Sequence, residues 1–147
     1  MEIQFPDGTH VRANGIAARD ADAGWRAFGL YCDAAWQPDW PSETIDWPDF
    51  GVPSSPETAA RQIVNAFERA RNGEQVEVGC LGGLGRTGTV VACMAILGGV
   101  PGADAVDWVR QHYRPEAVET SGQAAWVAWF AGWLERGENT TNARHGG

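Results

Sequence analysis

The stretch VGCLGGLGRTG, residues 78–88, decides the fold. It completes an alternating apolar run, Gln75–Cys80, that is typical of a strand, and it leads into a second apolar run, Thr87–Leu97, that is typical of a buried helix. Three glycines lie among the five residues that follow Cys80. Glycine lets consecutive backbone N–H groups turn towards one point, and the start of a helix adds positive potential there. The stretch therefore predicts an α/β fold with an anion-binding loop between strand and helix.

Two side chains of this loop suit reaction with a phosphate group. Arg86 carries a planar guanidinium that can contact two phosphate oxygens at once. The positive field at the loop favours the thiolate form of Cys80, which would make its sulfur a nucleophile near neutral pH. The backbone N–H groups that we expect to hold the phosphate oxygens belong to Leu81, Gly82, Gly83, Leu84, Gly85 and Arg86.

Short strands are predicted in the first third of the chain and mainly helices in the rest. The strand candidates are Met1–Phe5, Thr9–Ala13, Arg26–Cys32 and Glu43–Asp46. Further helices are predicted from a capping-box pattern at Ser54–Glu57 to about Arg71, over about Ala103–Tyr113, and over about Ser121–Glu135. On the last of these, Trp126, Trp129 and Trp133 recur at helical spacing, which predicts a stripe that faces the core.

Composition predicts one acidic domain. The 147 residues are 44% hydrophobic, enough for one core, and we expect a catalytic domain over 1–136 with a flexible tail over 137–147. The net charge of −8 disfavours nucleic acid and anionic lipid as partners. The sequence shows no apolar run of membrane-spanning length, no secretory signal and no Cys-x-x-Cys spacing. We therefore expect a monomeric protein in the cytoplasm, with free thiols.

The segment from Cys80 to Thr87 resembles the signature of the cysteine-based protein-tyrosine phosphatase superfamily. That signature is Cys, five residues, Arg, then Ser or Thr, and its loop glycines match Gly83 and Gly85. A cysteine and an arginine at this spacing arise often by chance, so the added glycines carry much of the specificity. The alternative is a buried cysteine beside an ordinary glycine turn.

Two further segments support the same resemblance. Trp-Pro-Asp at 47–49 resembles the family's acid loop, although alone such residues more often form a plain turn. Residues 114–123 resemble the family's glutamine loop, in which Gln123 matches a glutamine that places the hydrolytic water. An alternative for this segment is a helix N-cap at Thr120 or Ser121, and both interpretations can hold together.

The resemblance implies a fold and a two-step reaction. The fold is a single domain of the protein-tyrosine-phosphatase type, in which helices flank a central, mostly parallel sheet. Cys80 would attack phosphorus while Arg86 holds the phosphoryl oxygens, and Asp49 would protonate the leaving oxygen. Water near Gln123 would then hydrolyse the phosphocysteine, while Thr87 donates a hydrogen bond to the departing thiolate. The resemblance implies a phosphorylated protein or peptide as substrate and no metal or other cofactor.

Several residues depart from the family pattern or lie outside it. Gly79 precedes the cysteine, where the family has a histidine that tunes the thiolate. Glu119 lies where tyrosine-specific members carry another glutamine. Cys32 and Cys93 are expected to be small buried residues. An alternative, known in some cysteine phosphatases, is that one of them traps an oxidised Cys80 as a disulfide.

The chemistry leaves more than one function open. Phosphotyrosine hydrolysis is the first hypothesis. A dual-specificity or small-metabolite phosphatase of the same mechanism is the second, because the loop also resembles that of small dual-specificity members. A phospho-binding module without activity would be favoured by loss of Cys80, Arg86 or Asp49, and all three are present. Inositol-lipid substrates are disfavoured, because the loop between Cys80 and Arg86 contains no basic residue.

Overall fold

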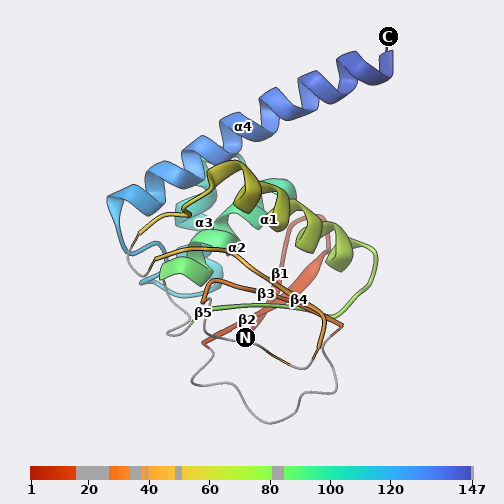
Figure 1. Ribbon diagram of the computed structural model, residues 1–147. Helices are drawn as coiled ribbons and strands as arrows, with labels where there is room; N and C mark the ends of the chain where they lie inside the picture. Colours follow the sequence, from red (N-terminus) through yellow and green to blue (C-terminus); the bar gives the residue numbers. More distant parts are fainter. Residues whose placement is uncertain (16–26, 34–37, 39, 49–50, 81–84, 147) are drawn as a thin grey trace.

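The computed structural model describes residues 1–15, 27–33, 38, 40–48, 51–80 and 85–146 (Figure 1). Within these residues the strands form one sheet in the order β1-β2-β5-β3-β4. The strands are β1 (Glu2–Gln4), β2 (His10–Gly15), β3 (Phe28–Tyr31), β4 (Ser42–Thr44) and β5 (Val76–Cys80). Each overlaps a strand predicted from the sequence, so those predictions are confirmed.

The sheet is mostly parallel, as predicted. β1 pairs with β2 in antiparallel orientation, whereas the pairs β2–β5, β5–β3 and β3–β4 are parallel. β5 lies at the centre and is buried along its whole length. Ligands of open α/β sheets bind at the carboxyl ends of the strands, and Cys80 lies at that end of β5.

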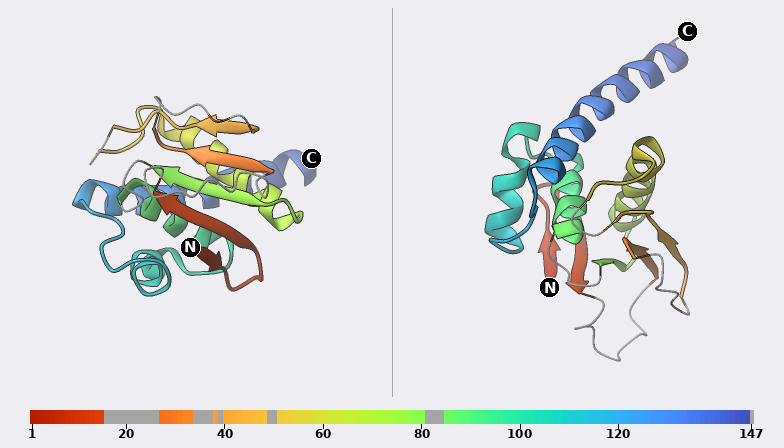
Figure 2. Two further views of the ribbon diagram at one scale, coloured as in Figure 1. Left: turned by 90° about the horizontal axis from the view of Figure 1, so that it is seen from below. Right: turned by 60° about the vertical axis from the view of Figure 1, so that its left-hand side comes forward.

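The helices lie on one side of the sheet, with α2 between α1 and α3 (Figures 1 and 2). They are α1 (Pro56–Arg71), α2 (Gly85–Leu97), α3 (Ala105–His112) and α4 (Ser121–Gly146), with a 3-10 turn η2 (Gly102–Asp104) before α3. α2 contacts all three other helices, and every residue from Gly85 to Ala95 is buried. Among the described helices, none combines the length and apolar character that a bilayer crossing requires.

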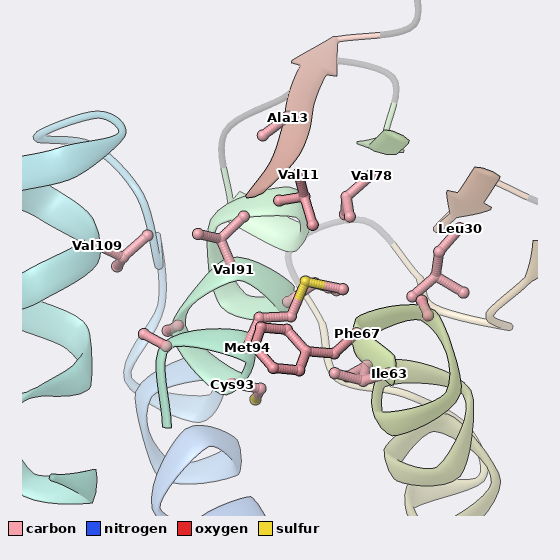
Figure 3. Packing of buried hydrophobic residues seen from close by; sticks show 14 of the residues in the cluster. Val11, Ala13, Leu30, Ile63, Phe67, Val78, Val91, Cys93, Met94 and Val109 are labelled. Carbon is pink, nitrogen blue, oxygen red and sulfur yellow. The ribbon is translucent and has the colours of Figure 1, made fainter. Parts of the chain in front are cut away.

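The hydrophobic core lies between the sheet and the helices (Figure 3). Val11 of β2, Leu30 of β3 and Val78 of β5 point into it from the sheet, and Phe67 of α1 and Met94 of α2 meet them. Successive residues of a strand face opposite sides, so the residues directly before and after each of these three along its own strand face away from the helices.

The start of α1 differs in detail from the prediction. Ser55 is the N-cap, and its side chain makes no capping hydrogen bond. The capping-box pattern of Ser54–Glu57 therefore marks the right place without forming the reciprocal bonds that define a capping box. Pro56 at the first helical position, with its preset φ, is compatible with the helix start.

α4 is longer than the sequence pattern predicts. We expected its end near Glu135, whereas the helix continues to Gly146. Trp126 is buried, and Trp129 and Trp133 pack against the core, which confirms the predicted stripe. Beyond the stripe α4 extends away from the other elements (Figure 1). The division into a domain over 1–136 and a flexible tail over 137–147 stays a prediction.

The face of the sheet opposite the helices contains a buried carboxylate. Glu77 of β5 is 1% exposed. Tyr31 Oη donates a hydrogen bond to Glu77 Oε1 at 2.6 Å, and Asn14 Nδ2 donates one to Glu77 Oε2 at 3.0 Å. Trp40 Nε1 in turn donates to Tyr31 Oη at 2.9 Å. These bonds join β2, β3 and β5 on the face of the sheet opposite the helices. They offset the free-energy cost of burying the Glu77 carboxylate.

We expect Tyr31→Phe to lower the free energy of unfolding by about 1–3 kcal/mol, because the buried Glu77 carboxylate loses the hydrogen bond from the Tyr31 hydroxyl while the aromatic ring stays. Urea denaturation at pH 7, followed by tryptophan fluorescence, measures the change. An unchanged midpoint would show that the hydroxyl contributes nothing to stability at this site.

Candidate active site

Cys80 lies at the carboxyl end of the central strand, next to the start of α2. Its Sγ accepts a hydrogen bond from Thr87 Oγ1 at 2.9 Å. Thr87 lies in the first turn of α2, and both residues are buried. The bond connects β5 with α2 across the loop of residues 81–84. A hydroxyl that donates to sulfur at this distance stabilises negative charge there, as a nucleophile or a leaving thiolate requires.

Arg86 is anchored by two backbone carbonyl groups. Its Nη1 donates to Cys32 O at 2.8 Å and to Trp47 O at 3.0 Å. Cys32 follows β3, and Trp47 follows β4 by three residues. With 6% of its surface exposed, Arg86 is thus held in one orientation between three segments of the chain. A fixed guanidinium next to Cys80 is suited to orient a phosphate group before any reaction.

The structure describes some of the predicted site residues, whereas others lie outside the residues that it describes. Cys80, Arg86 and Thr87 come together as expected, and Gly85 begins α2 beside them. The predicted acid Asp49 and the predicted phosphate contacts Leu81, Gly82, Gly83 and Leu84 lie outside the described residues.

The residues that flank position 49 are held from two sides. Trp47 Nε1 donates to Gly51 O at 2.7 Å, which closes the segment on itself. Gln123 Nε2 donates to the same carbonyl at 3.2 Å. The segment that resembles the acid loop is therefore joined to the segment that resembles the glutamine loop, 72 residues further along the chain.

The predicted N-cap of α4 is confirmed. Gln123 N donates to Thr120 Oγ1 at 3.0 Å, so the hydroxyl of Thr120 caps the first turn of the helix. The side chain of Gln123 is directed back along the segment, where its Oε1 accepts a hydrogen bond from Glu119 N at 2.8 Å. The helix-cap interpretation of this segment therefore holds, and the water-placing role of Gln123 stays a prediction.

Glu119 lies beside the start of α2. A Cβ added at Gly85 would collide with the Glu119 carboxylate, so only glycine at position 85 leaves room for it. A Cβ at Gly88 would likewise lie 2.5 Å from Ala117 Cβ. Both glycines thus let the segment before α4 pack directly on α2.

Arg110 is a residue that the sequence analysis missed. Its Nε donates to Ala117 O at 3.0 Å and its Nη2 to Val118 O at 2.9 Å. Val118 has a φ of +63°, a left-handed conformation that a β-branched residue seldom adopts. Arg110 therefore holds a strained turn that leads into Glu119. An arginine on an amphipathic helix such as α3 gives no local signal for such a role.

Comparison with known proteins agrees with this arrangement. Residues 37–128, more than half of the chain, match the family described as protein-tyrosine phosphatase. The chain belongs to this family. Among solved structures, Tk-PTP in its active form superposes on this chain with a TM-score of 0.68 at 25% identity, over 88% of this chain and 95% of that one.

Curated relatives share part of the domain. Uncharacterized protein MJECL20 of Methanocaldococcus jannaschii is 40% identical over 80 residues, which are 54% of this chain and 52% of that protein. Protein tyrosine phosphatase domain-containing protein 1 of Danio rerio is 36% identical over 89 residues, which are 60% of this chain and 12% of that protein. The chain therefore spans about half of the first relative and a small part of the second.

The glycine before the nucleophile position is explained by a tyrosine on the neighbouring strand. A Cβ at Gly79 would lie 3.0 Å from Asn14 O and 3.2 Å from Tyr31 Cδ1. The Tyr31 ring therefore occupies the space into which a side chain at position 79 would extend. A larger residue at position 79 would therefore require Asn14 or Tyr31 to shift by a few tenths of an ångström.

The two other cysteines of the chain differ in how close they lie to Cys80. The β3–β5 ladder pairs Tyr31 with Gly79, and Cys32 N donates to Gly79 O at 2.9 Å, so Cys32 and Cys80 follow as neighbours on one face. Burial, and then the nearby Cys80, raise the pKa of the Cys32 thiol. Cys93 lies within α2, where burial raises the pKa of its thiol.

Mild peroxide is expected to cross-link Cys80 to Cys32. Peroxide oxidises the Cys80 thiolate to a sulfenic acid, and attack by the Cys32 sulfur then forms the disulfide with loss of water. Peptide mapping by mass spectrometry detects the product. Cys32→Ser should abolish the cross-link, and Cys93→Ser, the matched control, should not affect it. A disulfide between Cys80 and Cys93 would contradict the assignment.

Proposed function

We propose that this chain is a phosphomonoester hydrolase, a protein-tyrosine phosphatase that works through a phosphocysteine on Cys80. The observation that carries the proposal is the hydrogen bond from Thr87 Oγ1 to Cys80 Sγ beside a buried, anchored Arg86. Phosphoryl transfer through sulfur needs a nucleophile, an oriented cation, and a hydrogen-bond donor to the sulfur when the thiolate later leaves phosphorus.

The first step forms a sulfur–phosphorus bond. The Cys80 thiolate attacks phosphorus in line with the ester oxygen, and the phosphorus–oxygen bond breaks. Asp49 donates its proton to the departing oxygen, because an alkoxide or phenolate leaves poorly. The Arg86 guanidinium and the backbone N–H groups of residues 81–86 hold the three phosphoryl oxygens, so the step depends on positioning and charge.

The second step returns the enzyme to its starting state. A water molecule gives a proton to Asp49 and attacks phosphorus, the sulfur–phosphorus bond breaks, and the electron pair returns to Cys80 Sγ. Thr87 donates its hydrogen bond to that leaving thiolate. Inorganic phosphate is released, and neither step uses a cofactor or a metal ion.

The substrates that we propose are phosphorylated proteins or peptides. Phosphotyrosine places its phosphate at the end of a long side chain, which suits a nucleophile as buried as Cys80, 2% exposed. The net charge of −8 favours substrates with basic residues near the phosphate over nucleic acid or anionic membranes. We further propose that residues 1–136 form the catalytic unit and that it acts as a monomer in the cytoplasm.

Turnover of four substrates tests the proposal: p-nitrophenyl phosphate and peptides with phosphotyrosine, phosphoserine or phosphothreonine. We expect hydrolysis of the two aryl esters and none by Cys80→Ser, whose thermal midpoint should stay close to that of the unaltered chain. Equal rates on all three peptides would favour the dual-specificity alternative. Binding of phosphopeptides without any turnover would favour the non-enzymatic module.

Arg86→Lys should lower kcat/KM for p-nitrophenyl phosphate by about a hundredfold or more. A lysine ammonium cannot bond Cys32 O and Trp47 O and still present a planar fork to phosphate. Arg61→Lys is the matched control, because Arg61 lies in an exposed ion pair with Glu57 at 3.5 Å, on α1. Unchanged kcat and KM in Arg86→Lys would argue against a direct contact with phosphate.

A further inference from the structure

The structure assigns Gln123 a role in the first step of the proposed reaction: it is a positioning residue that holds the acid-loop segment through Gly51. This inference rests on the proposed function, and it differs from the water-placing role that the sequence resemblance implies. It starts from the side chain itself, which is 0% exposed and hydrogen-bonded at both ends of its amide.

The Gly51 carbonyl is where the two loops meet. It accepts one hydrogen bond from Trp47 Nε1 at 2.7 Å and another from Gln123 Nε2 at 3.2 Å. Trp47 and Gly51 flank Asp49 by two residues on each side. Val52 lies close to the start of α4, since a Cβ placed on Gly122 would be 3.8 Å from its Cγ1. The part of the acid-loop segment that follows Asp49 is therefore bound to the start of α4.

Gln123 is itself held rigidly enough to serve as an anchor. Its Oε1 accepts from Glu119 N at 2.8 Å, and its own N–H is capped by Thr120. The turn before Glu119 is fixed in turn by the two hydrogen bonds of Arg110 and by the left-handed Val118. Strain of this kind persists where the surrounding contacts impose it, and it is typical of sites that need a set geometry.

The amide of Gln123 is poorly placed to orient water. An amide that positions a water molecule must direct an oxygen or an N–H group into the space where the water lies. In this chain Oε1 is bonded to a backbone N–H, Nε2 is bonded to a backbone carbonyl, and the side chain has no exposed surface. Its contacts instead reach the segment of the general acid, where a displacement of about 1 Å can slow proton transfer by about a hundredfold.

The dependence of kcat/KM on the leaving group distinguishes positioning of the acid from placement of the water. Loss of acid positioning slows esters of weakly acidic phenols most, because those leaving groups depend on the proton from Asp49. For Gln123→Leu we expect kcat/KM, which reports the first chemical step, to fall about tenfold or more with phenyl phosphate and by less than about threefold with p-nitrophenyl phosphate. With phenyl phosphate, the double variant Gln123→Leu/Asp49→Ala should have nearly the same kcat/KM as Asp49→Ala alone.

Two further variants guard against a folding artefact. Gln123→Glu has the same shape and keeps an acceptor for Glu119 N, but it cannot donate to Gly51 O, so it should reproduce the pattern of Gln123→Leu. Gln62→Leu is the matched control, because Gln62 Nε2 also donates to a backbone carbonyl, Thr44 O at 3.1 Å, away from the site. It should leave kcat for both esters unchanged.

The opposite pattern would overturn the inference. If Gln123 places the water, kcat/KM of the variants should stay unchanged for both esters, because water enters only in the second step, while kcat falls equally for both and phosphocysteine accumulates in acid-quenched samples.

A readout without turnover tests the anchor independently. By NMR, Gln123→Glu should speed hydrogen exchange of the Trp47 indole N–H by about tenfold if Gln123 holds the segment; an unchanged rate would also overturn the inference. Inactivity of the unaltered chain on every ester would refute the proposed function, and this exchange rate would still decide whether Gln123 is the anchor.

Discussion

The hydrogen bonds from Arg86 to two backbone carbonyls are the constraint on which the rest of the site depends. A guanidinium that is 6% exposed needs acceptors, and here they are Cys32 O and Trp47 O. The strand order supplies them, since β3 lies between β5 and β4. The ends of all three strands are thereby gathered around the start of α2. Arg86, which is proposed to hold phosphate, thus also binds the start of the acid-loop segment through Trp47 O.

Those parts of the site that depend on neighbours in sequence could be predicted. The strand and the helix expected on either side of residues 81–84 appear as β5 (Val76–Cys80) and α2 (Gly85–Leu97), because apolar periodicity and glycine position are local signals. Cys80, Arg86 and Thr87 lie within one such unit, so a correct strand and helix are enough to bring them together. The same holds for the tryptophan stripe of α4, whose spacing alone determines which face is buried.

The features that depend on contacts between distant segments could not be predicted. Alternation along β5 suggests a solvent-facing Glu77, yet Tyr31 and Asn14 from neighbouring strands bury it and satisfy it. The role of Arg110 depends on how closely the segment before α4 approaches α3, which no pattern within α3 encodes. In each case the decisive partner lies on another element, and the sequence shows only that a polar residue is present.

The site combines support from both faces of the sheet, and this bears on how sulfur chemistry is tuned without a histidine at position 79. Behind the sheet, Tyr31 fills the space next to Gly79 and is bonded to Glu77, so the strand ends are held by a side chain of β3 rather than by one at position 79. In front, Thr87 donates directly to Cys80 Sγ. In the proposed reaction, the groups of the described residues that can stabilise negative charge on sulfur are the start of α2, Arg86 and Thr87. These groups are local, so a chain of net charge −8 can still have one point that attracts the phosphate dianion of the proposed substrate.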